Sequence, residues 1–207
     1  MHTKITVVRH GRTDWNLEGR VQGSIDRPLD EVGKEQAKEI ALKLKGVNAD
    51  CIYSSDLLRA EQTAQIIAEH LDLTCTSSPD LRELSYGKIE GMLWRDFSEE
   101  YAKAIDHYSS LPWENRKMFA YTDTSETYHS AMARVLGFFH QVCMQNPLKH
   151  MIVVTHGGII KGLLAEILGV DDRMVKSQNT GFITLKYEDQ AFAVEEIQGV
   201  DIKMELS

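Results

Sequence analysis

The sequence has few cysteines and no long run of apolar residues. Cys51, Cys75 and Cys143 are scattered, so they form neither a metal-binding pair nor a disulfide framework. No apolar run is long enough to cross a bilayer, and the first four residues lead into a strand without a signal-peptide core. We therefore expect a cytoplasmic protein that has no membrane partner.

Positive charge is also scarce in this chain. It has 23 lysines and arginines against 31 aspartates and glutamates, which gives a formal net charge of −8. This balance argues against nucleic acid and anionic membranes as main partners. In such an acidic chain, a local group of arginines is expected to hold an anion. The length of 207 residues fits one α/β domain that spans residues 1–207.

Short apolar runs alternate with helical patterns along the chain. Strands are predicted at 5–8, 51–54, 73–76, 151–154, 182–187 and 192–197. An aromatic-rich insertion interrupts this alternation at about 92–124, where it is expected to form a small helical lid. The pattern predicts a three-layer α/β/α sandwich, with a mostly parallel sheet and helices on both faces. The aromatic residues are expected to form the insertion's own core rather than a wall above a site.

The helix boundaries follow from turn and capping residues. Asp30 is expected to begin a helix that Gly46 ends, and Ser55-Asp56 is expected to cap the next helix. The glycine-punctuated segment 14–23 is expected to be a polar loop with about one helical turn.

The first strand ends in a dense group of polar residues, Arg9-His10-Gly11-Arg12-Thr13. Ligands of parallel sheets bind at the carboxyl ends of the strands, so chemistry is expected here. Arg9 offers a planar fork for phosphate oxygens, and Gly11 is expected to let the backbone approach a bound group. An imidazole beside a fixed cation is a poor base, but it is a good nucleophile toward an electrophile that the cation also holds.

A second strand ends in the same way, in Thr155-His156-Gly157-Gly158. Residues 151–154 form the most apolar strand, which predicts a central position in the sheet. If this strand neighbours the first, His10 and His156 lie side by side. The glycines open a helix whose free N–H groups favour an anion, and Arg59 follows a third strand end.

Taken in order, these segments resemble the histidine phosphatase superfamily, which includes cofactor-dependent phosphoglycerate mutases and many small phosphatases. The resemblance covers nearly the whole chain. The segments that carry it are 9–16, Gln22-Gly23, Pro28-Leu29, 54–60, 81–91 and 154–158.

The resemblance implies that His10 becomes phosphorylated, and that Glu83 donates and later accepts a proton. Arg9, Arg59 and His156 would clamp the phosphoryl group. The residues that would assist in phosphate or substrate binding are Asn16, Gln22, Gly23 and Gly157. It also implies a small phosphorylated substrate and catalysis without a cofactor or a metal.

This chemistry is reasonable on physical grounds. Phosphoryl transfer needs mainly positioning and charge stabilisation, which two guanidiniums and an imidazolium around three oxygens supply. A carboxyl group held against a phosphate dianion tends to stay protonated because the two charges repel, so Glu83 could act as an acid. The alternative for Glu83 is a surface residue paired with Arg82.

One departure from the family pattern places the chain nearer to the phosphatases than to the mutases, and a second is a departure from the phosphatases themselves. The insertion has Arg116-Lys117 where the mutases have an arginine pair, and Ser125-Glu126-Thr127 lacks the glycine of many phosphatases. Glu126 is then predicted to be a charge in the first turn of a helix, where it interacts favourably with the helix dipole.

Several alternatives to a phosphatase remain open. They are mutase-type transfer, a non-catalytic binder of phosphorylated ligands, and a metallohydrolase with zinc on His10, His156 and Glu83. A homodimer is also an option that the sequence leaves open.

Overall fold

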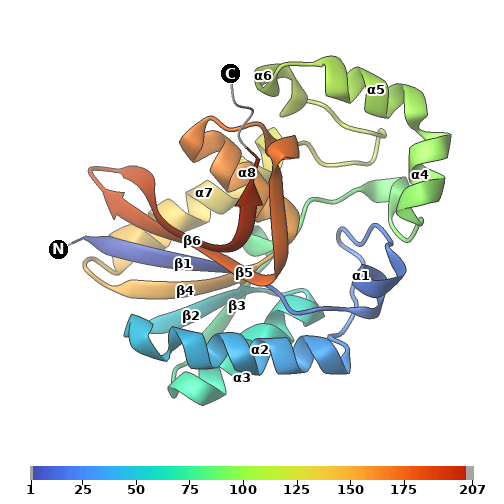
Figure 1. Cartoon of the computed structure of the whole chain (residues 1–207). Helices are drawn as coiled ribbons and strands as arrows, with labels where there is room; N and C mark the ends of the chain where they lie inside the picture. The colour runs from blue at the N-terminus through green and yellow to red at the C-terminus, as the bar shows by residue number, and fades with distance from the viewer. Residues whose placement is uncertain (1, 204–207) are drawn as a thin grey trace.

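The computed structural model describes residues 2–203, which form a six-stranded sheet between two layers of helices (Figure 1). The strands are β1 (Thr3–Arg9), β2 (Cys51–Ser55), β3 (Cys75–Ser78), β4 (His150–Thr155), β5 (Val175–Glu188) and β6 (Ala191–Ile202). The α-helices are α1 (Asp14–Glu18), α2 (Glu31–Leu44), α3 (Leu58–Leu71), α4 (Trp94–Glu100), α5 (Ala102–Ser110), α6 (Trp113–Arg116), α7 (Tyr128–Gln145) and α8 (Gly157–Leu168). Short 3₁₀ turns are η1 (Lys45–Val47), η2 (Pro79–Leu81), η3 (Gly87–Ile89) and η4 (Asp172–Met174).

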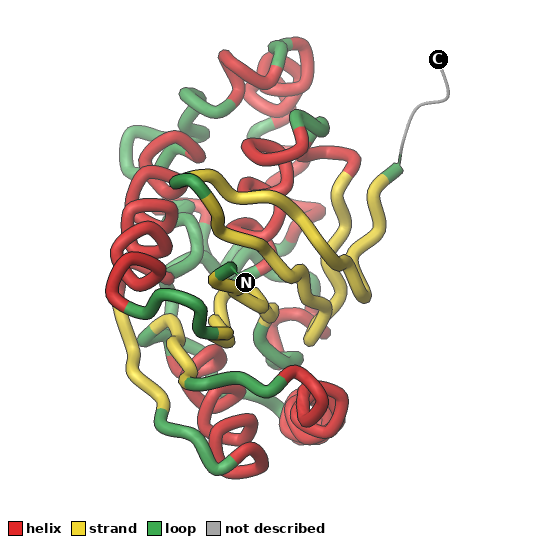
Figure 2. The backbone as a smooth tube through the Cα atoms, turned by 90° about the vertical axis from the view of Figure 1, so that its left-hand side faces the viewer, coloured by secondary structure: helices red, strands yellow, loops and turns green. Residues whose placement is uncertain are grey.

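The sheet has the strand order β3-β2-β4-β1-β5-β6. The pairs β1–β4, β2–β4 and β2–β3 are parallel, whereas β5 runs antiparallel to both β1 and β6. The sheet is therefore mixed but mostly parallel, and β4 lies inside it, as its apolar sequence predicts. Figure 2 shows the strands between the two groups of helices, which confirms the three-layer prediction.

Successive side chains of the central strands point to opposite faces of the sheet, so the core has two halves. Ile5 and Val7 of β1 pack in the cluster that contains α7 and α8, whereas Val8 packs with α2 and α3. On β4, Val153 packs in the first of these clusters and Val154 in the second. Because both faces of these strands are buried, most of their inner positions are apolar. Thr6 of β1 is a buried polar exception, and its hydroxyl bonds that of Thr184 at 3.1 Å.

Three predicted boundaries are wrong for local reasons. Gly46 lies inside the 3₁₀ turn η1, and Asn48 after it takes the left-handed conformation with φ of 49°. Helix α3 has no side-chain cap from Ser55 or Asp56; instead, the Leu58 N–H donates to Asp26 Oδ1 at 2.6 Å. Strand β3 begins at Cys75, two residues later than predicted.

The closing strands β5 and β6 are longer than predicted, although they turn at residues 188–190 as expected. The extra length lies before Phe182 in β5 and after Ile197 in β6. Before Phe182, a register shift falls between Ser177 and Phe182, and Thr180 is left-handed with φ of 57°. This irregular segment has no alternating pattern that would predict a strand.

The insertion folds into the short helices α4, α5 and α6, which lie at the upper right in Figure 1. Its aromatic side chains pack mainly on one another, with Phe97 in contact with Tyr101 and Tyr121. The insertion therefore has a small core of its own, as predicted, but Trp94 is half-exposed and lines the cavity described below. No helix within residues 2–203 is both long and apolar enough to cross a membrane.

Gly11 and Gly33 let the first turn of α2 contact the segment that follows β1. A Cβ on Gly11 would lie 2.4 Å from the Gly33 carbonyl oxygen, and a Cβ on Gly33 would lie 2.1 Å from the Arg12 carbonyl oxygen. Gly11 therefore serves a close approach between two backbone segments, and the prediction that it faces a ligand is wrong.

This contact can be tested by adding a methyl group. Gly33→Ala is expected to lower the free energy of unfolding by about 1–3 kcal/mol, because backbone atoms cannot yield to the new Cβ. The control is Gly137→Ala on α7, where a Cβ would meet nothing within 4 Å. That change should raise the free energy of unfolding by up to about 1 kcal/mol. Urea unfolding measures both, and similar values for the two variants would contradict the close contact.

Candidate active site

Two buried histidines lie side by side where β1 and β4 end. The parallel register pairs Arg9 with Thr155, so His10 and His156 follow at the same level of the sheet. Their ring centroids are 5.2 Å apart with an interplanar angle of 61°. The pairing that the two polar strand ends predict is therefore present.

His10 is held as a neutral imidazole with one free nitrogen. Its Nδ1 lies 2.7 Å from the Gly11 carbonyl oxygen, which only accepts, so Nδ1 carries the proton. Burial lowers the pKa of His10 well below its usual value, and the charges of Arg59 and Arg9 lower it further. Nε2 therefore keeps its lone pair at neutral pH.

His156 is neutral as well. Burial lowers its pKa well below the usual value, and the nearby charge of Arg59 acts in the same direction. The protein groups alone therefore do not favour an imidazolium, and the imidazolium beside a phosphoryl group stays a prediction. Neither ring nitrogen of His156 has a hydrogen-bond partner among residues 2–203. A neutral ring donates one N–H, which could bind an oxygen atom of a ligand.

Two arginines surround the histidines, and each has donors left over. Arg59 is 1% exposed and donates to the carbonyl oxygens of Ile25 at 3.0 Å and Gly23 at 2.7 Å. Arg9 donates to the Ser177 carbonyl oxygen. In the described part of the chain, the Nε–H groups of both arginines are buried without a partner. Burial lowers the pKa of Arg59 to about 10, so it stays charged at neutral pH.

The segment from Thr13 to Gly23 supplies further polar groups. Thr13 and Asn16 form a capping box at the start of α1: the Thr13 N–H donates to Asn16 Oδ1, and the Asn16 N–H donates to Thr13 Oγ1. The amide oxygen of Asn16 is thus in use, and its Nδ2 donor is left for a cavity that Asn16, Gln22 and Gly23 line. Gln22 is fixed by the Thr13 hydroxyl, which donates to its Oε1 at 3.1 Å.

Glu83 faces this cavity from the segment after η2. Its Oε2 accepts from the Gly158 N–H at 2.9 Å, at the start of α8, and its Oε1 accepts from the Leu84 N–H at 3.0 Å. A Cβ on Gly158 would lie 2.5 Å from Glu83 Oε1, which explains the glycine. Arg82 pairs with Asp56 at 2.6 Å, so the alternative of a Glu83–Arg82 surface pair is wrong.

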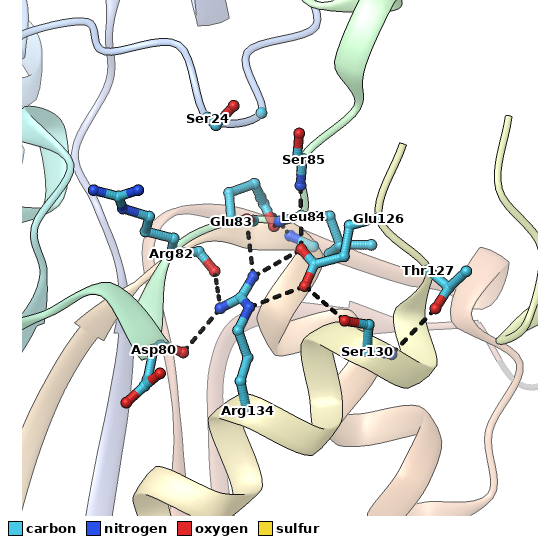
Figure 3. A network of polar contacts seen from close by, with 12 residues as sticks. Ser24, Asp80, Arg82, Glu83, Leu84, Ser85, Glu126, Thr127, Ser130 and Arg134 are labelled. Atoms are coloured by element: carbon cyan, nitrogen blue, oxygen red, sulfur yellow. Dashed lines mark hydrogen bonds and ion pairs between the residues drawn. The ribbon is translucent and has the colours of Figure 1, made fainter. Parts of the chain in front are cut away.

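Glu126 is not a first-turn charge. It precedes Thr127, whose side chain caps α7, and it forms an ion pair with Arg134 at 3.0 Å (Figure 3). Arg134 in turn donates to backbone oxygens around Glu83. The pair therefore connects α7 to the segment that bears Glu83.

These side chains enclose a cavity of about 210 Å³. The predicted site residues that line it are Arg9, His10, Asn16, Gln22, Gly23, Arg59, Glu83 and Gly157. His156 lies beside it through its contact with His10. The cavity has further lining residues that the sequence analysis did not assign to the site: Arg20, Val21, Tyr86, Trp94, Tyr128, Gly158, Lys161, Lys176 and Ser177.

Lys161 is the missed residue with the clearest signal. It lies four residues after Gly157 on α8, and helical spacing puts both on one face. No hydrogen bond or ion pair joins its ammonium group to another residue in the described part of the chain, and burial lowers its pKa. Burial raises the pKa values of Tyr86 and Tyr128, so both phenols are donors at neutral pH.

The geometry supports neither a mutase-type role for Arg116 nor a zinc site. Arg116 is 1% exposed and forms ion pairs with Asp171 at 2.6 Å and Asp172 at 3.1 Å, so it does not face the cavity. Within residues 2–203, no three histidine, cysteine or acidic side chains are grouped to hold a metal ion, and this includes the proposed zinc ligands.

Comparison with known proteins agrees with this geometry. Residues 5–199 match the family described as the histidine phosphatase superfamily, branch 1. The chain is 33% identical over 207 residues to the uncharacterized phosphatase PhoE of Bacillus subtilis, with 99% of this chain and 97% of the relative covered. It is 34% identical over 171 residues to a metal-independent phosphoserine phosphatase of Arabidopsis thaliana, with 80% and 68% covered.

A similar solved structure is the phosphoserine phosphatase of Entamoeba histolytica in complex with 3-phosphoglyceric acid. It has a TM-score of 0.78 and 30% identity, over 95% of this chain and 96% of that chain. The family match spans nearly the whole chain and the two relatives exceed 30% identity over most of it, so this protein belongs to the histidine phosphatase superfamily, branch 1.

Proposed function

We propose that this protein is a metal-independent phosphomonoesterase that hydrolyses a small phosphorylated metabolite through a phosphohistidine on His10. The observation that supports this best is the neutral, buried ring of His10, whose Nε2 keeps its lone pair beside Arg9 and Arg59. A neutral imidazole is a nucleophile, and the two guanidiniums are suited to hold the phosphoryl oxygens that it attacks.

In the first step, Nε2 of His10 attacks phosphorus and the ester P–O bond breaks. The unpartnered N–H groups of Arg9, Arg59 and His156 bind the equatorial oxygens, where charge accumulates in the transition state. Glu83, in its protonated form, gives its proton to the leaving oxygen, so the product alcohol departs neutral.

In the second step, Glu83 is a carboxylate and takes a proton from a water molecule. The oxygen of this water attacks phosphorus, the P–N bond to His10 breaks and inorganic phosphate forms. Glu83 regains its proton and His10 its lone pair, so both residues return to their starting states. One carboxyl group thus serves as acid and then as base.

We further infer that the substrate has a carboxylate close to its phosphate ester. Lys161, Tyr86 and Tyr128 line the cavity beyond the phosphate donors. An ammonium group and two phenols suit a carboxylate. The relatives agree with this class, because one is a phosphoserine phosphatase and another is a phosphoserine phosphatase that binds 3-phosphoglyceric acid.

Mutase-type transfer is the second candidate, and the resemblance of this chain to the mutases favours it. The position of Arg116 argues against it, because Asp171 and Asp172 hold the one arginine that could replace the mutases' arginine pair. Incubation with 3-phosphoglycerate distinguishes the two: a phosphatase releases inorganic phosphate, whereas a mutase yields an isomer. A non-catalytic binder would give neither product, and it would leave p-nitrophenyl phosphate intact in the presence of a chelator.

His10→Ala is expected to lower kcat by about 10⁴-fold or more, because the nucleophile and the other catalytic groups act as one unit. Phosphate release from p-nitrophenyl phosphate with a chelator present measures this loss. Acid-quenched protein incubated with labelled substrate should carry label only when His10 is present. Near-normal turnover in the variant would exclude the covalent route.

Glu83→Gln should affect substrates according to their leaving groups. The amide cannot donate a carboxyl proton, so kcat for glycerol phosphate should fall by about 10²–10⁴-fold. The first step with p-nitrophenyl phosphate, whose phenolate departs unaided, should change much less. Rapid-quench measurement of phosphoenzyme formation isolates that step. An equal loss on both substrates would argue against the acid role.

Lys161→Met should discriminate between substrates with and without a carboxylate. KM for phosphoserine should rise about 10–100-fold, which corresponds to one lost hydrogen bond to a charged group. KM for phosphoethanolamine, which lacks only the carboxylate, should stay nearly constant. Lys38→Met removes a lysine that pairs with Glu35 on the surface and serves as the control. Parallel changes for both substrates would contradict a carboxylate at Lys161.

A further inference from the structure

Glu83 lies in a segment that has no regular secondary structure. The segment runs from η2 to η3 without a strand or helix, so its backbone groups need partners elsewhere. Among residues 2–203, only two backbone N–H groups, those of Leu84 and Gly158, donate to the carboxylate itself. A general acid must lie within hydrogen-bond reach of the leaving oxygen, so the backbone around Glu83 needs a rigid support.

Arg134 of α7 provides this support with all five of its N–H donors (Figure 3). Its Nη1 donates to the carbonyl oxygens of Asp80 at 2.8 Å and Arg82 at 2.7 Å, and its Nη2 donates to that of Glu83 at 3.0 Å. The remaining donors, on Nε and Nη2, bind the two carboxylate oxygens of Glu126, each at 3.0 Å. One side chain thus binds three carbonyl oxygens within residues 80–83.

Glu126 extends the support to the other side of Glu83. Its Oε2 accepts from the Ser85 N–H at 3.3 Å, and its own backbone N–H donates to the Ser85 carbonyl oxygen at 2.7 Å. Its Oε1 also accepts from the Ser130 hydroxyl at 3.3 Å, which connects it to the first turn of α7. The backbone is therefore fixed both before and after the residue whose carboxyl group faces the cavity.

We propose that Arg134 and Glu126 are positioning residues for the proton transfer that Glu83 performs. This inference rests on the proposed function. The two residues act through geometry: Arg134 bonds the carbonyl oxygens of the segment, and both carboxylate oxygens of Glu126 accept from its guanidinium. A displacement of about 1 Å in a reacting group can cost about 10²-fold in rate, so loss of these bonds should weaken proton transfer without removing the phosphate donors.

The same segment provides a matched control in Arg82. This side chain also makes a two-pronged ion pair, with Nε at 2.7 Å and Nη2 at 2.6 Å from the carboxylate oxygens of Asp56. The pair is exposed and binds no backbone oxygen of residues 80–85. Arg82→Met therefore removes an ion pair of the same kind from the same segment and leaves the backbone contacts in place.

The test compares kcat for glycerol phosphate with the rate of phosphoenzyme formation from p-nitrophenyl phosphate. In Arg134→Met, the first should fall by about 10²-fold, and the second by less than about fivefold. KM should stay nearly constant. Arg134→Lys should behave like Arg134→Met, because a single ammonium cannot reproduce the fork. Arg82→Met should change both rates by less than about threefold. Equal losses on both substrates in Arg134→Met, or the same pattern in Arg82→Met, would overturn the proposal.

A double-mutant cycle separates this inference from the proposed function. If Arg134 acts through Glu83, then Arg134→Met should cost little further activity in a Glu83→Gln background. If Glu83→Gln itself shows no dependence on the leaving group, the acid role fails first. If Glu83→Gln shows that dependence and Arg134→Met does not, only the positioning role fails. Should Arg134→Met not fold, Glu126→Gln undergoes the same comparison with the same criterion.

Discussion

The parallel pairing of β1 with β4 is the constraint on which the site depends. The register that pairs Arg9 with Thr155 brings two histidines to the same level of the sheet. A slip of one residue would turn the buried side chains of a strand to the opposite face, so packing against helices on both sides fixes this register. The apolar core thus determines where the imidazoles meet, although it contains none of the chemistry.

The partners of four buried or half-buried arginines separate those suited to a ligand from those that hold the fold together. Arg116 forms ion pairs with two aspartates and Arg134 with a glutamate, so carboxylates balance the charges of these arginines. In the part of the chain that the structure describes, Arg9 and Arg59 donate to carbonyl oxygens alone, which satisfy hydrogen bonds without cancelling the charge. A positive potential therefore persists in the cavity of an acidic protein, where it attracts an anion.

Much of the fold and of the site could be predicted from the sequence, because both depend on local patterns. The strand ends identified His10 and His156, and the structure brings them together. The role of Gly11 could not be predicted, since its contact with Gly33 exists only after α2 packs. Ser177 reaches the cavity from an irregular part of β5 that has no alternating pattern. The position of Lys161 could have been predicted, because its helical spacing from Gly157 places both residues on one face of α8.

The hydrogen bond from Nδ1 of His10 to the Gly11 carbonyl oxygen also fixes regiochemistry. A free imidazole in water exchanges between two tautomers, so an electrophile can be captured at either nitrogen. In His10, Nδ1 carries the proton, so only Nε2 has an available lone pair. Any covalent adduct of His10 should therefore form as a single positional isomer, the one on Nε2.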